Sequence, residues 1–154
     1  MRRPVFTALV LLVGLTVAAG ASARVQRDIG AQAGQLELQD GAGTVVISMQ
    51  RGALIGRLDR GRLIVTDRRG AAEVTVFGAE ETIETNERTT VYRGDELRFK
   101  IAGQGWRVGI QGVGLDASLV GRGVVTLRGT GTASFDGEPF RPWPLEFRSL
   151  VLGG

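Results

Sequence analysis

Residues 94–137 read GDELRFKIAGQGWRVGIQGVGLDASLVGRGVVTLRGTGTASFDG, and glycine returns in this stretch every eight or nine residues. Glycines stand at 94, 103, 112, 121, 129 and 137, and the rhythm extends back through 78, 70, 61 and 52. The one double step skips position 86, where Asn86 stands. Asparagine is the residue that best replaces glycine in a left-handed backbone conformation. Turn residues at this interval are typical of a stack of short β-strands.

Between the glycines, apolar and polar residues alternate. Leu97, Phe99 and Ile101 are separated by Arg98 and Lys100. Period-two alternation with a polar opposite face indicates strands that bury one side. We therefore predict that the apolar set of each segment forms the core, including Leu36, Leu38, Trp106, Val108, Ile110, Leu115, Ala117, Leu119, Val125 and Leu127. Leu145 and Phe147 are predicted to open the final strand. No helical period is found after the first 23 residues.

The rhythm predicts an all-β fold, an antiparallel sandwich or jelly roll of short strands with glycine turns every 8–9 residues. A β-solenoid is the main alternative, with two such units, about 17 residues, in each rung. A closed barrel fits less well, because short strands make a consistent tilt and stagger harder to achieve. A solenoid would place Trp106 near Val124 one rung on, which is a poor match of side chains.

The first 23 residues have the form of a secretory signal peptide. Two arginines precede an apolar run over 5–19, and Ala21-Ser22-Ala23 is a small-x-small cleavage site. We expect cleavage after Ala23, a polar lead-in over 24–35 and a single all-β domain over 36–154. The mature protein is then secreted or extracytoplasmic.

Composition narrows the function. The chain has no Cys and no His, so neither a disulfide nor a Ser–His or Cys–His nucleophile pair can form, and zinc lacks its usual ligands. Removing Arg2 and Arg3 lowers the formal charge from +3 to +1, which is no footprint for nucleic acid. We expect no enzyme activity, no catalytic residues, no cofactor and no metal site.

Two segments stand out from the rhythm. Residues 139–144 read PFRPWP, and three prolines in six residues interrupt sheet pairing. Phe140 and Trp143 in this segment either cap an open end of the core or contact a partner. Residues 80–87 carry four glutamates and form either a polar strand pair turning at Asn86 or a longer loop. A solvated acidic face is favoured there over a calcium site, because the ligand spacing of calcium loops is missing.

Residues 89–99 (TTVYRGDELRF) and 112–123 (GVGLDASLVGRG) resemble a recurrent family of small secreted β-rich bacterial proteins. No function is assigned to that family. The resemblance covers about 70 residues, depends mostly on turns and alternation, and implies no catalytic residues.

The sequence therefore predicts a non-catalytic extracytoplasmic β module for surface interaction or structural assembly. Its partner would be a cell-wall polymer, a protein or a second copy joined through strand edges. The alternative is a carrier that holds a lipid-like ligand in an apolar groove between sheets. Small residues would line such a groove, and the candidates are Ala72, Gly109, Ala117 and Ala133.

Overall fold

The computed structural model describes residues 33–154, and 82% of them lie in strands. There is no helix among the described residues, and the strands form one antiparallel sheet that is not closed. The predicted all-β antiparallel sandwich is confirmed. The strands are β1 (Gly34–Asp67), β2 (Ala72–Phe77), β3 (Glu81–Asn86), β4 (Thr89–Phe135), β5 (Arg141–Pro142) and β6 (Arg148–Leu152).

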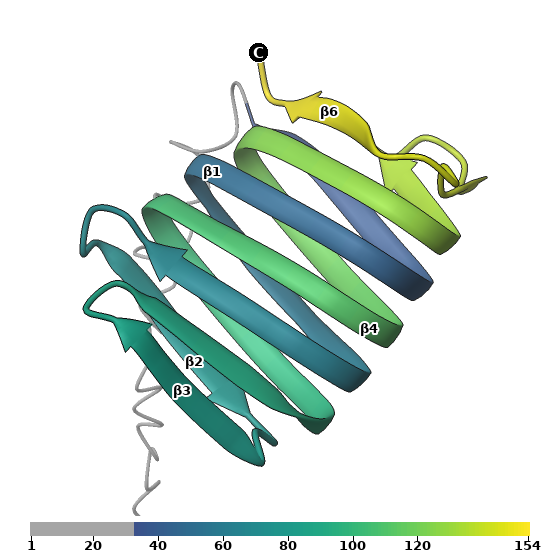
Figure 1. The fold of residues 1–154 in the computed structure, drawn as a ribbon. Helices are drawn as coiled ribbons and strands as arrows, with labels where there is room; N and C mark the ends of the chain where they lie inside the picture. The colour runs from purple at the N-terminus through teal and green to yellow at the C-terminus, as the bar shows by residue number, and fades with distance from the viewer. Residues whose placement is uncertain (1–32) are drawn as a thin grey trace, which may run out of the picture.

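The two long strands, β1 and β4, are wound together like a coiled ribbon (Figure 1). Most residues along the middle of β1 pair with two residues of β4, one on either side. Val45, for example, pairs with Ile110 and with Leu127, which are 17 residues apart. Every turn of β1 therefore lies between two turns of β4 that run in the opposite direction.

This winding folds the single sheet into two facing layers. The first layer contains residues 34–43 and 52–61 of β1, residues 94–103, 112–121 and 129–135 of β4, and strands β2 and β5. The second layer contains residues 43–52 and 61–67 of β1, residues 89–94, 103–112 and 121–129 of β4, and strands β3 and β6. A turn of the coil therefore contains two of the eight- or nine-residue units, one in each layer. Adjacent turns are antiparallel, so the solenoid alternative, in which like residues meet one rung apart, is not observed.

The chain passes between the layers at two rows of stacked glycines. The first glycine row is Gly34, Gly121, Gly52 and Gly103, and the second is Gly129, Gly43, Gly112, Gly61 and Gly94; the members of each row pair in that order. The backbones approach so closely there that a Cβ on Gly43 would lie 2.2 Å from the carbonyl oxygen of Arg128. Gly43 also has a φ of +150°, which side-chain-bearing residues rarely adopt.

The glycine rows explain why the strands are much longer than the sequence suggested. Glycine turns between short strands were predicted. Instead, most of these glycines bend a strand whose hydrogen-bond pairing continues through the bend, so β1 has 34 residues and β4 has 47. Asn86 was also misread, because it is not among the residues with positive φ. Its side-chain oxygen accepts a hydrogen bond from the Arg88 N–H at 3.0 Å, in the turn between β3 and β4.

The core lies between the two layers and is made by alternate residues, as predicted. Trp106 is buried at 1% exposure, and all ten predicted core positions named above are buried. Leu145 and Phe147 do not open the last strand, which was a wrong prediction. Both are exposed and precede β6, because the prolines of 139–144 delay the return of the chain to the sheet.

The two ends of the stack differ. One end is closed by β2 and by the hairpin of β3 with β4. Of the two predictions for residues 80–87, the polar strand pair is therefore observed: β3 pairs with residues 89–93 of β4, and the turn follows Asn86. The opposite end carries β5, β6 and the proline-rich segment (Figure 1). Strand β1 begins two residues before the predicted boundary at 36. The predicted signal peptide and most of the lead-in lie outside the described residues. No helix in the described part of the chain is long and apolar enough to span a membrane.

Candidate ligand-binding pocket at the C-terminal end

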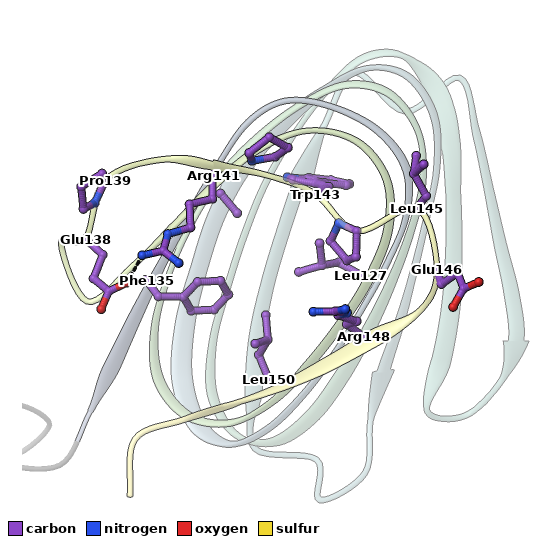
Figure 2. A pocket seen from close by; sticks show the side chains of 13 residues that line it. Leu127, Phe135, Glu138, Pro139, Arg141, Trp143, Leu145, Glu146, Arg148 and Leu150 are labelled. Atoms are coloured by element: carbon purple, nitrogen blue, oxygen red, sulfur yellow. Dashed lines mark ion pairs between the residues drawn. The ribbon is translucent and has the colours of Figure 1, made fainter.

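A pocket of about 710 Å³ opens at the end of the stack that carries β5 and β6. The last strands of both layers form its walls, and the segment 143–146 passes across it (Figure 2). The pocket has a largely apolar wall, formed by Leu127, Ala133, Phe135, Trp143, Leu145 and Leu150. Ala133 is the one of the four predicted groove residues that lines it. The volume of the pocket lies within the range of small-molecule sites, about 300–1,000 Å³.

Two backbone hydrogen bonds fix the end of the proline-rich segment to β4. Pro142 and Pro144 have no N–H to donate, but Trp143 between them donates its N–H to the carbonyl of Gly131 at 3.0 Å. The Gly129 N–H donates to the carbonyl of Pro144, also at 3.0 Å. These two bonds hold Trp143 and Pro144 against residues 129–131 of β4.

Trp143 is turned inward and is 5% exposed. A Cβ on Gly41 would lie 2.5 Å from Cη2 of the Trp143 ring, so the absence of a side chain at Gly41 makes room for the indole. The indole Nε1 is buried and has no hydrogen-bond acceptor among the described residues. Trp143 therefore closes this end of the core, as the capping interpretation predicts, and also forms part of the pocket wall.

Each layer places one arginine at an inward position of its last strand. Arg148 of β6 pairs with buried Leu127, and Arg141 of β5 pairs with buried Ala133. Residues directly opposite each other in an antiparallel pair lie on the same face, so both arginines project from the core-facing side. Figure 2 shows the two guanidinium groups on opposite sides of the pocket.

Other charged groups at the pocket leave Arg148 without a counterion. Arg141 lies 3.6 Å from the carboxylate of Glu138, and both side chains are well exposed. Glu146 also lines the pocket, but its carboxylate forms no salt bridge with Arg148. Arg148 has no ion pair or hydrogen bond to any other described side chain. Among the four charged residues that line the pocket, Arg148 is thus the cation that an incoming anion meets unpaired.

Exposed apolar side chains gather beside the pocket. Phe140, Leu145, Phe147 and Val151 all lie within twelve residues, and Leu145 and Val151 are more than three-quarters exposed. Val151 pairs with exposed Val124 on the outer face of the second layer. The guanidinium of Arg128 lies 5.5 Å from the centre of the Phe147 ring, which fixes that ring on the surface.

Two carboxylates elsewhere have perturbed pKa values with structural causes. Burial acts to raise the pKa of Asp67, but four backbone N–H groups of the following loop donate to its oxygens, and the net pKa is lowered. The pKa of Asp116 is lowered by the Asp40 N–H, which donates at 2.9 Å, against burial and together with the nearby Arg57. The Asp67 carboxylate stabilises the loop between β1 and β2, and the Asp116 carboxylate stabilises a contact between β4 and β1. The described residues contain no group of three or more Asp or Glu arranged to hold a metal ion.

The structure brings Phe140 and Trp143 to the same end of the molecule, but they differ in exposure. Phe140 is 40% exposed and available to a partner, whereas Trp143 is buried. The sequence analysis missed Arg141 and Arg148. A signal for Arg148 was present, because positions 148, 150 and 152 share one face of the last strand and only the first is charged. The role of Arg141 depends on a two-residue strand that alternation does not reveal.

Comparison of the chain with protein-family models, with curated proteins and with solved structures gives no match. The resemblance of residues 89–99 and 112–123 to a secreted bacterial family stays a prediction.

Proposed function

We propose that this protein is a non-catalytic extracytoplasmic β module that acts through the C-terminal end of its stack. The observation that carries the proposal is the coincidence, at one end, of a pocket of about 710 Å³ and of exposed Phe140, Leu145 and Phe147. Exposed apolar groups around a concave site are typical of interaction surfaces. The absence of Cys and His from the chain supports a binding role over catalysis.

Assembly through strand edges is less well supported than surface interaction. Natural proteins guard free edges with charges, prolines and short strands. Strand β3 is fully exposed and carries Glu81 and Glu84, and β5 has only two residues, one of which is Pro142. At β6 the inward position opposite Leu127 is Arg148. The edges of β3, β5 and β6 therefore each carry a feature that disfavours pairing with another copy.

A carrier for a lipid-like ligand is the second candidate, and the apolar wall of the end pocket favours it. The space between the layers is filled along most of the stack, since Ala117 packs in the core with Leu115 and Leu119. A ligand would therefore enter at the C-terminal end and not along a groove between the sheets.

Site-specific photo-crosslinking in the natural host tests where the protein is contacted. The photoreactive residue p-benzoylphenylalanine replaces Phe147 in one variant and Phe77 in a matched control. Phe77 lies at the opposite end of the stack and is 67% exposed, against 55% for Phe147, so the control probe is at least as accessible to solvent. Circular dichroism establishes that both variants fold.

The proposal predicts a defined adduct of the position-147 variant, seen as a discrete mass increase, and none from position 77. Equal labelling at both positions, or labelling at 77 alone, would remove the C-terminal end as the contact surface. A ladder of homodimer adducts at both ends would favour edge assembly instead.

A further inference from the structure

We infer that the end pocket binds a single-chain anionic amphiphile, with Arg148 holding the anionic head and the apolar wall holding the chain. This inference rests on the proposed function and names the ligand class of the same site. It depends on three features of the pocket: the inward arginines, the composition of the wall and the position of the opening.

The arginines lie where the rest of the strand pattern demands apolar side chains. On β6 the inward positions are Arg148, Leu150 and Leu152, and Leu152 is 1% exposed. Arg148 is exposed at this position, so its guanidinium can be reached by an anion from solvent. Carboxylates and phosphates suit a guanidinium, because its planar fork donates two hydrogen bonds to them.

A second guanidinium is within the same pocket. Arg141 projects from the opposite layer, and its ion pair with Glu138 is long, at 3.6 Å, between exposed groups. Exposed pairs of this kind contribute little to stability, so an incoming anion can compete with Glu138 for Arg141. The anion thus meets one free cation, Arg148, and one that is loosely held.

The wall selects an alkyl chain over a polar polymer. Leu127, Phe135 and Leu150 face the space beside the arginines, and Trp143 closes its inner end. Sugars need many hydrogen-bonding groups, and beyond its two arginines and two glutamates the wall offers few polar side chains. An alkyl chain with one anionic end can therefore place the chain against the apolar side chains and the anion on Arg148.

A different explanation for Arg148 is that it only guards the free edge of β6 against pairing. Reversing the sign of the charge at position 148 distinguishes the two explanations. A glutamate at position 148 guards the edge as well as an arginine does, but it repels an anionic head. The deciding variant is therefore Arg148→Glu.

Isothermal titration calorimetry of residues 24–154 provides the test, with ligands kept below their micelle concentrations. The probes are decanoate, uncharged decanol, decyltrimethylammonium and, for the head alone, acetate. Lys100→Glu is the control, since Lys100 is exposed on the outer face of β4 and the charge change is the same. Arg148 is itself exposed, and thermal melts establish that each variant folds.

We expect decanoate to bind saturably with 1:1 stoichiometry. Decanol and acetate should each bind at least about tenfold more weakly than decanoate. Arg148→Glu should weaken decanoate by about tenfold or more and improve decyltrimethylammonium, while Lys100→Glu changes neither. Equal affinity of decanoate for the wild type and Arg148→Glu would overturn the inference. So would equal affinity for decanoate and decanol.

Three further outcomes would also overturn it. Binding to anionic phosphatidylglycerol vesicles without binding of monomeric decanoate would assign the site to a membrane surface. No decanoate binding, together with crosslinking at position 147, would keep the proposed function and reject the ligand class. Loss of both signals would reject the proposed function itself.

Discussion

Replacing Gly112 by alanine should destabilise the protein far more than the same change at Gly109, three residues earlier on β4. A Cβ on Gly112 would lie 2.1 Å from the carbonyl oxygen of Arg60 and 3.0 Å from the Cα of Gly61. The first obstacle is backbone, so no side-chain rotation relieves it. Gly112 also pairs with Gly43 on its other side, which leaves no free direction of movement.

The cost follows from these contacts. The strands must separate locally by about 1 Å, which breaks roughly two strand hydrogen bonds at about 1 kcal/mol each. Overpacking adds about 1–3 kcal/mol. We expect Gly112→Ala to lower the free energy of unfolding by about 3–5 kcal/mol and the Tm by roughly 10–20 °C.

Gly109→Ala is the matched control. Its Cβ would meet only the Cβ of Ile64, at 3.8 Å, and its φ is ordinary. Alanine in a strand interior is favoured over glycine by about 0.5–1 kcal/mol, so this variant should be as stable as the wild type or slightly more stable. Urea unfolding followed by circular dichroism measures both. Similar losses in the two variants, or none at Gly112, would refute the close stacking of the glycine rows.

Two further variants probe the ends and bends of the stack. Trp143→Ala should cost about 3–5 kcal/mol in urea unfolding, because the indole is buried against Gly41; unchanged stability would mean that Trp143 is a surface platform and not a cap. Asp67→Asn should cost on the order of 1 kcal/mol at pH 7, because the charged carboxylate accepts four backbone hydrogen bonds. The lowered pKa of Asp67 means that its contribution is complete above the unfolded value of about 3.9 and disappears as the pH falls through the folded value. Melting curves from pH 7 to pH 2 should therefore show the wild type and Asp67→Asn converging in acid, and a constant difference would contradict this origin of the pKa shift.

The two-layer core was predictable from the sequence, because alternation is a local property. Leu97, Phe99 and Ile101 repeat at period two, and all three are buried. The division into strands was not predictable in the same way. A glycine that ends a strand and a glycine that bends a continuous strand look alike in sequence, and only its pairing with another glycine, as in Gly61 with Gly112, distinguishes them.

The candidate site was predictable in part. Phe140 and Trp143 were found because three prolines mark the segment as unusual. Arg148 and Arg141 were not found. Their positions on opposite sides of the pocket depend on which strand is the last in each layer. That arrangement is set by contacts between residues far apart in the chain, such as β6 with residues 123–127.

Native mass spectrometry of the protein purified from its natural host and kept undenatured tests the central claim most directly. The wild type and Arg148→Glu are compared side by side. We predict that the wild type carries one bound acidic amphiphile per chain, released on collisional activation, and that Arg148→Glu emerges bare. A wild-type chain without bound mass, or the same adduct on both proteins, would contradict the assignment of the end pocket as an anion-selective binding site.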